Sequence, residues 1–310
     1  MKSLSTLFRV LADAPRWARA VLLCVLAFSL SFGPILISAQ PAYGRWIVPH
    51  TLTQPALGLP YLPAEWEFDD LERAAAAAPV SLPDEARVPV LMYHYVSELP
   101  SDADAYRVDL TVPPESFRAQ LQYLADEGYH AITLTDLYRH LTEGYPLPDR
   151  PIILTFDDGY RDAYEVVFPL LVEFGFSGTF FVLATPAHHE WNEYLTWSQI
   201  KEMADAGMDI QAHGRDHVDL RGRSYDYLVY QVLGIKEAVE AHTGQPVRFF
   251  CYPSGQYDEA LIEMLRSVGY WGAVTTHWGK AHTREGLMEL ARVRVRGQGT
   301  LEDFIASIEK

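Results

Sequence analysis

From residue 88 onward, short apolar runs alternate with stretches in which apolar residues recur every three or four positions. The second pattern is typical of helices that bury one face, and Leu228, Val232, Ile235 and Val239 follow it at steps of four, three and four. The short runs predict strands near residues 89–95, 130–134, 151–156, 178–184, 208–212, 247–252, 271–276 and 290–295. Regular alternation of strand and helix predicts an α/β fold with parallel strands and helical crossovers.

Helix boundaries and candidate functional residues fit this arrangement. Thr196 and Gln199 form a capping box at the start of one predicted helix, and the helical pattern from Ala260 stops at Gly269. The polar residues that could bind a metal or take part in catalysis follow the carboxyl ends of predicted strands. The carboxyl end of the strands is where a β/α barrel keeps its active site.

The first 87 residues have a different pattern. Residues 1–19 carry four basic side chains and one acidic one, and residues 20–44 contain no charged residue. A basic segment before an uncharged stretch of more than about 20 residues predicts a signal peptide or signal anchor. The sequence Ile37-Ser38-Ala39 is only a marginal cleavage site, so we favour an anchor that is not cleaved. This prediction places the remaining chain outside the cytoplasm, in the periplasm or at the cell surface, and a cleaved segment would make the protein secreted.

Residues 45–87 contain six prolines, which is typical of a tether. The remaining segment, 88–310, is long enough to bury one sizeable core, so we expect a single catalytic domain there.

Composition narrows the class of protein further. The net charge of −16 and the pI near 5.0 argue against a nucleic-acid partner, because binding to the phosphate backbone needs a basic surface. The two cysteines, Cys24 and Cys251, lie in very different segments and imply no disulfide framework.

Two polar clusters carry the candidate chemistry. The apolar run Pro151–Leu154 leads into Thr155–Tyr160, which holds the adjacent carboxylates Asp157 and Asp158. His213 and His217 stand four apart after a later predicted strand. An Asp-Asp-Gly sequence alone is commonly a turn. Together, however, one carboxylate and two imidazoles can hold a divalent cation and leave the second carboxylate as a base, which is a hydrolase arrangement.

These residues resemble the motifs of the polysaccharide deacetylase family, carbohydrate esterase family four, whose shared region is the NodB homology domain. The resemblance covers roughly residues 88–305. Thr155–Tyr160 is similar to the first motif, which implies that Asp157 is the catalytic base and Asp158 a metal ligand. His213–Leu220 is similar to the second motif and implies that His213 and His217 complete the ligand set, although Gly214 replaces the usual Ser or Thr.

The resemblance also implies the fold and the cofactor. It predicts an irregular, incompletely closed (β/α) barrel and one divalent metal ion per chain. Zinc is favoured, with cobalt, nickel or iron as alternatives.

Phe250–Gly255 resembles the third motif, which lines the pocket and supplies a backbone N–H to the oxyanion. We assign this N–H to Ser254, which stands where the family has a tyrosine, while Cys251 stands where the family has an arginine. Several aromatic or ring-bearing residues are candidates for sugar contacts, with packing as the alternative for each: Tyr160, Tyr252, Pro253, Trp191, Trp197 and Trp278.

The late histidine motif of the family is missing, since Leu290–Val295 contains no histidine. The strand that ends at His94 resembles the opening strand of the poly-β-1,6-N-acetylglucosamine N-deacetylase branch, which implies that His94 is the catalytic acid. A core histidine is the alternative. The implied function is metal-dependent removal of N-acetyl groups from a polysaccharide that contains N-acetylglucosamine. Chitin and peptidoglycan remain possible substrates, and a catalytically silent carbohydrate-binding relative is the alternative class.

Overall fold

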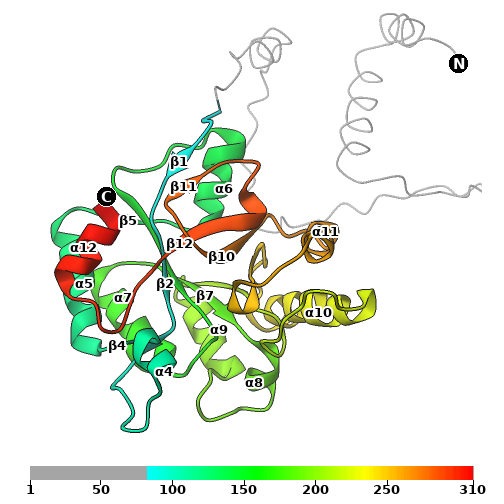
Figure 1. Ribbon diagram of the computed structural model, residues 1–310, viewed down its shortest axis with the longest axis horizontal. Helices are drawn as coiled ribbons and strands as arrows, with labels where there is room; N and C mark the ends of the chain where they lie inside the picture. The colour runs from blue at the N-terminus through cyan, green and yellow to red at the C-terminus, as the bar shows by residue number, and fades with distance from the viewer. Residues whose placement is uncertain (1–81, 310) are drawn as a thin grey trace, which may run out of the picture. The chain divides into compact units, whose positions relative to one another are not determined.

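The computed structural model describes residues 82–309. Its centre is a ring of seven parallel strands, surrounded by helices (Figure 1). In the order of the ring, the strands are β2 (Val90–Tyr93), β12 (Leu290–Arg294), β10 (Gly272–Trp278), β9 (Phe249–Cys251), β8 (Asp209–Ala212), β7 (Thr179–Val182) and β6 (Pro151–Phe156).

Pairing between β2 and β6 closes this ring. The family resemblance predicted an incompletely closed barrel, and this detail was wrong, because every strand of the ring is hydrogen-bonded to both neighbours. The ring is nevertheless irregular. Strands β8 and β9 share one residue pair, Ala212 with Phe250, and the register between β10 and β12 shifts. β5 (His130–Ala131) pairs with the start of β6 and adds an eighth strand beside the ring.

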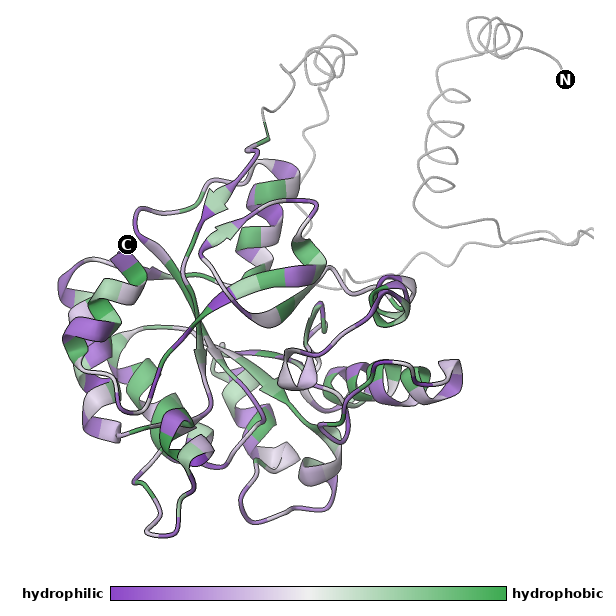
Figure 2. Ribbon diagram, viewed as in Figure 1, coloured by the Kyte–Doolittle hydropathy of each residue, from purple (hydrophilic) through white to green (hydrophobic). Residues whose placement is uncertain are grey.

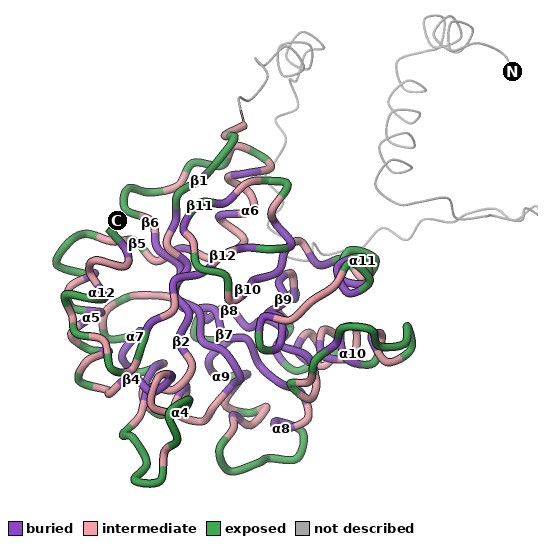
Figure 3. Tube along the Cα trace, in the orientation of Figure 1, coloured by how far each residue is buried: buried purple, intermediate pink, exposed green. Residues whose placement is uncertain are grey.

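The helices are α4 (Ala105–Leu110), α5 (Pro114–Asp126), α6 (Leu134–Glu143), α7 (Phe168–Phe174), α8 (Ala184–His188), α9 (Trp197–Asp205), α10 (Tyr225–Thr243), α11 (Glu259–Ser267) and α12 (Leu301–Glu309). Apolar and polar residues alternate around the outer helices, and buried residues gather along the central strands (Figures 2 and 3). The predicted capping box of Thr196 and Gln199 begins α9.

Most predicted strands differ from the structure by one or two residues at an end, and three of the differences are informative. The predicted strand 89–95 ends at Tyr93, and the chain then forms the separate short strand β3 (Tyr95–Val96), which pairs with β4 (Thr111–Val112). The predicted strand 130–134 is only two residues long, because Thr133 caps α6 through a capping box with Asp136. β10 runs two residues past its predicted end, to Trp278.

The predicted basic segment 1–19, the apolar segment 20–44 and most of the tether lie outside the described residues. At the end of the predicted tether, β1 (Ala86–Arg87) pairs antiparallel with β11 (Ala281–His282). Within residues 82–309, no helix has both the length and the apolar character needed to cross a membrane.

Candidate metal centre and active site

A cavity of about 450 Å³ lies at the carboxyl ends of the ring strands. Seven of the nine predicted site residues line it, and Tyr160 and Pro253 do not. The complete lining is His94, Tyr106, Asp157, Asp158, His213, His217, Tyr252, Ser254, Thr276 and Arg294. The parallel ring therefore brings together residues that are up to 200 positions apart (294 − 94) in the sequence.

Asp158, His213 and His217 form a compact group of possible metal ligands, which we call the ligand trio. The Asp158 Oδ1 atom lies 3.0 Å from His213 Nε2 and 3.3 Å from His217 Nε2. His213 Nδ1 lies 2.7 Å from the backbone carbonyl of Cys251. Since a carbonyl only accepts, this contact places the proton on Nδ1 and leaves Nε2 free to bind a cation beside Asp158.

The ligand trio fits a divalent cation. Its three ligand atoms lie within 4.8 Å of one another, and the buried Asp158 Oδ1 has no hydrogen-bond partner within residues 82–309. An orphaned buried oxygen is costly unless another group compensates it, and a carboxylate with two imidazoles is a typical zinc donor set. Asp158 and His217 also have φ angles of 71° and 49°, and such strained backbone is concentrated at functional sites.

Charge in the trio favours a bound cation as well. Burial alone raises the pKa of Asp158, but the neighbouring His213 outweighs burial and lowers that pKa below its ordinary value. Burial lowers the pKa of His213, whereas the neighbouring Cys251 and the Asp158 carboxylate raise it well above its ordinary value. The site therefore attracts positive charge, which a proton or a metal ion can supply.

Asp157 has entirely different partners. Both carboxylate oxygens accept hydrogen bonds of 2.8 Å from the Arg292 guanidinium, and Arg292 also donates to Thr155. Both Asp157 and Arg292 are buried. Burial raises the pKa of Asp157, but the Arg292 guanidinium has the larger, opposite effect, so the pKa lies below its ordinary value. The carboxyl therefore stays ionised at neutral pH. Asp157 is thus available to accept a proton.

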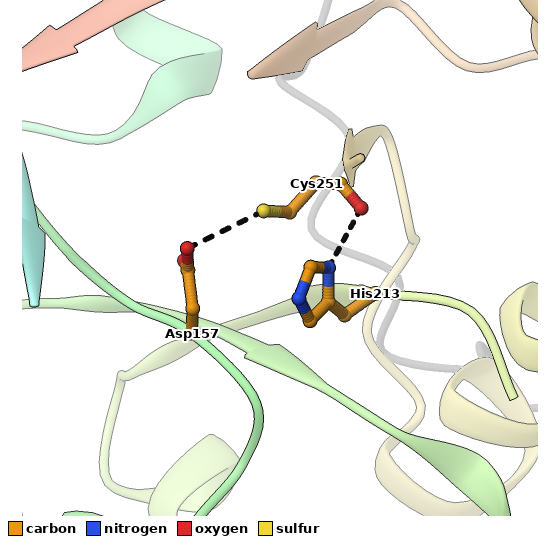
Figure 4. A group of neighbouring side chains, drawn as sticks. All are labelled: Asp157, His213 and Cys251. Carbon is orange, nitrogen blue, oxygen red and sulfur yellow. Dashed lines mark hydrogen bonds between the residues drawn. The ribbon is translucent and has the colours of Figure 1, made fainter. Parts of the chain in front are cut away.

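A second group with metal-ligand chemistry, formed by Asp157, His213 and Cys251, adjoins the trio (Figure 4). The Cys251 thiol lies 3.5 Å from Asp157 and 3.4 Å from the Arg292 guanidinium. A cation here would have to bind beside that guanidinium, which already neutralises Asp157. Burial also raises the pKa of Cys251, and a protonated thiol is a poor ligand. We therefore assign the metal to the trio that contains Asp158.

His94 lies at the edge of the same cavity. Its Nε2 atom is 3.8 Å from Asp157 Oδ2, and its side chain is 10% exposed. Burial lowers the pKa of His94, and the attraction of Asp157 only partly opposes this effect. The imidazole is therefore mostly neutral near pH 7 and is placed to exchange a proton with a bound substrate.

Comparison with known proteins agrees with this geometry. Residues 144–273 match the family model described as polysaccharide deacetylase. YxkH of Bacillus subtilis, whose name assigns it to the polysaccharide deacetylases without naming a substrate, is 32% identical over 224 residues, which cover 72% of this chain and 77% of YxkH. The chain belongs to the polysaccharide deacetylase family.

Two further relatives extend the comparison. The poly-β-1,6-N-acetyl-D-glucosamine N-deacetylase of Escherichia coli is 24% identical over 240 residues, which cover 64% of this chain and 36% of that protein. The solved structure of the Streptococcus pyogenes deacetylase PplD in complex with acetate superposes with a TM-score of 0.68 at 29% identity, over 73% of this chain and 99% of that one. The chain is thus an enzyme of the NodB type, and members of this family depend on a metal ion.

Sequence reasoning missed Arg292 of the deacetylase. The third motif lacks its usual arginine at Cys251, and Arg292 reaches the same place from β12, where it contacts both Cys251 and Asp157. A signal was present, because Arg292 and Arg294 alternate with Val293 and Val295 in a predicted strand. Two charged residues on one face of a buried strand require a partner inside the barrel.

Gln231 is the second missed residue. It lies fully buried on α10, where its Oε1 atom accepts hydrogen bonds from the backbone N–H groups of Arg215 at 2.9 Å and Asp216 at 3.3 Å. Its Nε2 atom donates to the Asp216 carboxylate. Gly214 has a φ of 86° and no side chain to support the loop. Gln231 therefore supplies the support for the segment between the two histidine ligands of the deacetylase.

Some of the residues predicted to contact substrate line the cavity, and others pack elsewhere in the barrel. Ser254 lines the cavity and has a φ of 55°, while the Tyr252 hydroxyl donates to the Met288 carbonyl and so fixes its ring at the cavity wall. Tyr160 stacks on Tyr95 at a centroid distance of 3.8 Å, and Pro253 is buried in the turn that also contains Ser254. Tyr252 is the only predicted sugar contact that lines this cavity, and Ser254, the predicted N–H donor, lines it as well.

Proposed function

We propose that this deacetylase removes N-acetyl groups from poly-β-1,6-N-acetylglucosamine and releases acetate. The observation that carries the proposal is the position of His94, which lies beside Asp157 in the cavity although β12 contains no histidine. An opening-strand histidine is the feature by which the sequence resembles the poly-β-1,6-N-acetylglucosamine branch. The similarity to the Escherichia coli enzyme of that specificity supports the same substrate.

The residues of the site divide the reaction between them. Asp158, His213 and His217 would hold one divalent cation, with zinc favoured, which supplies polarisation of the acetyl carbonyl and a lowered pKa of water. The Asp157 carboxylate accepts a proton from water as the water oxygen bonds to the acetyl carbon. Because Arg292 lowers the pKa of Asp157, this carboxylate is a weak base. It can therefore deprotonate only a water molecule whose own pKa is lowered.

The remaining steps involve the oxyanion and the leaving amine. The Ser254 N–H is our candidate donor to the developing oxyanion. When the carbon–nitrogen bond breaks, the departing amine needs a proton, which His94 donates after taking it up from Asp157 or solvent. Acetate and the free glucosamine amine are the products, and Asp157 returns to its ionised form.

We further propose that the reaction takes place outside the cytoplasm, with residues 20–44 as the membrane anchor. The support is the charge pattern alone, in which four basic residues precede 25 uncharged positions (44 − 20 + 1).

Acetate release from a panel of polymers tests the proposed function. The protein, reconstituted with zinc or cobalt, is incubated with oligomers of β-1,6-linked N-acetylglucosamine, chitin oligomers and peptidoglycan. We expect the highest kcat/KM with the β-1,6-linked oligomers and no release after chelation. A higher value with chitin or peptidoglycan would reject the proposed substrate. Full metal occupancy without acetate release from any polymer would favour a silent carbohydrate-binding relative.

A further inference from the structure

The described part of the deacetylase has a second cavity that borders the first. It also has a volume of about 450 Å³, and Arg294 lines both. Its walls come from the end of β10, from the segment that follows β12, and from helices α5 and α12. Helices α5 and α12 lie side by side although they are far apart in the sequence (Figure 1). A chain that occupies the first cavity can therefore extend past Arg294 into the second.

Trp278 provides an apolar surface at the rim of this second cavity. It is the last residue of β10, and its side chain is 69% exposed. A tryptophan that is left this exposed at the edge of a binding cavity offers a broad apolar face at little entropic cost. Pyranose rings also have apolar faces, formed by their C–H groups, so the indole suits a sugar.

Gln120 provides a polar group on the inner wall. Only 3% of the residue is exposed, and its Oε1 atom accepts a hydrogen bond from the Tyr93 hydroxyl at 2.9 Å. The side chain lines the cavity, and since Oε1 is occupied by Tyr93, the amide N–H groups of Nε2 are the donors that Gln120 can offer there. A ligand with hydroxyl or carbonyl oxygens would accept hydrogen bonds from them.

The wall that follows β12 is held firmly. The Gly297 N–H donates to the Asp109 carbonyl at 2.8 Å, and a Cβ atom at position 297 would lie 2.1 Å from the Thr111 carbonyl oxygen. Asp109 also binds the guanidinium groups of Arg294 and Arg296. The cavity therefore exists before a ligand binds, which reduces the entropic cost of binding.

Charge around the cavity suits a neutral ligand. The two arginines share Asp109, and the Asp303 carboxylate of α12 also lies in the wall, where it caps the backbone of Thr300. Two positive and two negative side chains leave no net charge. An N-acetylated sugar is neutral, whereas a deacetylated unit is cationic near neutral pH.

We propose that this second cavity is a subsite for an N-acetylhexosamine unit adjacent to the unit that undergoes hydrolysis. In this subsite Trp278 stacks on the sugar ring and Gln120 donates to a ring substituent. The proposal rests on the proposed function, because it assigns the subsite to the same polymer. Its volume lies within the range of about 300 to 1,000 Å³ that is typical of small-molecule sites.

Replacement of Trp278 tests the subsite. We expect Trp278→Ala to raise KM for a β-1,6-linked tetramer about tenfold with little change in kcat, and Trp278→Phe to restore most of the affinity. Hydrolysis of 4-nitrophenyl acetate, which fills only the first cavity, should stay unchanged, as should the bound metal and the unfolding midpoint. Tyr145→Ala is the matched control, because Tyr145 is also an exposed aromatic but lies just before β6, at the opposite end of the ring.

Direct binding separates this inference from the proposed function. The tetramer is titrated calorimetrically into metal-loaded protein that carries Asp157→Asn, with and without Trp278→Ala. A tenfold loss of affinity supports the subsite, even if the wild-type protein releases no acetate, and in that case only the proposed function fails. Equal affinities, or an equal loss in the Tyr145 control, would overturn the subsite while acetate release by the wild type leaves the proposed function intact.

Discussion

At the scale of single residues, the surroundings of two adjacent aspartates give them different chemistry. Asp158 has a positive φ and faces two imidazoles, whereas Asp157 faces a buried guanidinium. Asp158 is therefore placed to bind a cation, and Asp157 stays ionised without one. The sequence shows only two identical neighbours, and the turn between them produces the difference.

Substitution of each aspartate should separate these roles. We expect Asp158→Ala to lose both metal and activity, since one of three protein ligands is gone. Asp157→Asn should retain the metal and lose about 100- to 10,000-fold in turnover, which is the usual contribution of positioned proton transfer. Elemental analysis and acetate release measure the two properties. Loss of metal from the Asp157 variant would reverse the assignment.

The buried pair of Asp157 and Arg292 should show strong coupling in stability. We expect Arg292→Met to lower the free energy of unfolding by about 3 to 5 kcal/mol, because it leaves a buried carboxylate without its guanidinium partner. The double variant Arg292→Met with Asp157→Asn should recover much of that loss. Urea unfolding of the two single variants and the double variant gives the coupling energy. Additive losses would show that the two side chains act independently.

Two histidines, His94 and His277, are candidates for the catalytic acid that protonates the leaving amine. His94 lines the cavity, whereas His277 is exposed near Tyr257, with ring centroids 6.1 Å apart, and does not line it. We expect His94→Ala to reduce acetate release by about 100-fold or more with metal retained, and His277→Ala by less than about tenfold. Rates measured on the same oligomer decide between them, and a larger effect at His277 would contradict the assignment.

At the scale of elements, helix α10 controls a loop of the metal site. Gln231 binds the backbone of Arg215 and Asp216, which connect the two histidine ligands, and Thr185 of α8 binds the Asp216 side chain. His217 adopts its positive φ at the end of this segment. The geometry of one ligand thus depends on a helix that does not touch the metal.

Replacement of Gln231 should weaken metal binding without removing a ligand. We expect Gln231→Ala to lower zinc affinity by about 10- to 100-fold, as is usual when a group that orients a ligand is lost. Gln245→Ala is the control, because Gln245 also binds backbone groups, the Ile210 N–H and the Met208 carbonyl, but is not among the residues that line the active-site cavity. Competition with a chelator measures both. Equal effects on zinc affinity would mean that general destabilisation, and not ligand placement, is the cause.

At the scale of the whole molecule, charge should distinguish product from substrate. The chain has a net charge of −16, and each deacetylation turns a neutral unit into a cation. We expect partly deacetylated oligomers to bind more tightly than acetylated ones at low salt, and the difference to shrink near 0.1 M salt, where the Debye length is about 10 Å. Titration of both oligomers at low and high salt measures it. A difference that salt does not change would exclude this account.

Sequence patterns predicted the ring strands well because buried parallel strands are continuous apolar runs. The strands β1, β3, β4 and β11 have two residues each, too few to show a period, and were not predicted. The grouping of Asp157, Asp158, His213 and His217 was predicted because all follow strand ends. Arg292 was not, since its partner lies 135 positions earlier and only the ring brings them together.

The closure of the ring by β12 also sets the order in which the enzyme becomes complete. β2 and β12 are neighbours although about 200 residues separate them, and closing a loop of that length costs more entropy than closing a short one. A growing polypeptide that had reached only β9 would already contain every residue of the ligand trio, but Asp157 would still lack its guanidinium. The contact that holds Asp157 ionised therefore depends on the last strand of the ring, whereas the ligand trio comes entirely from earlier ones.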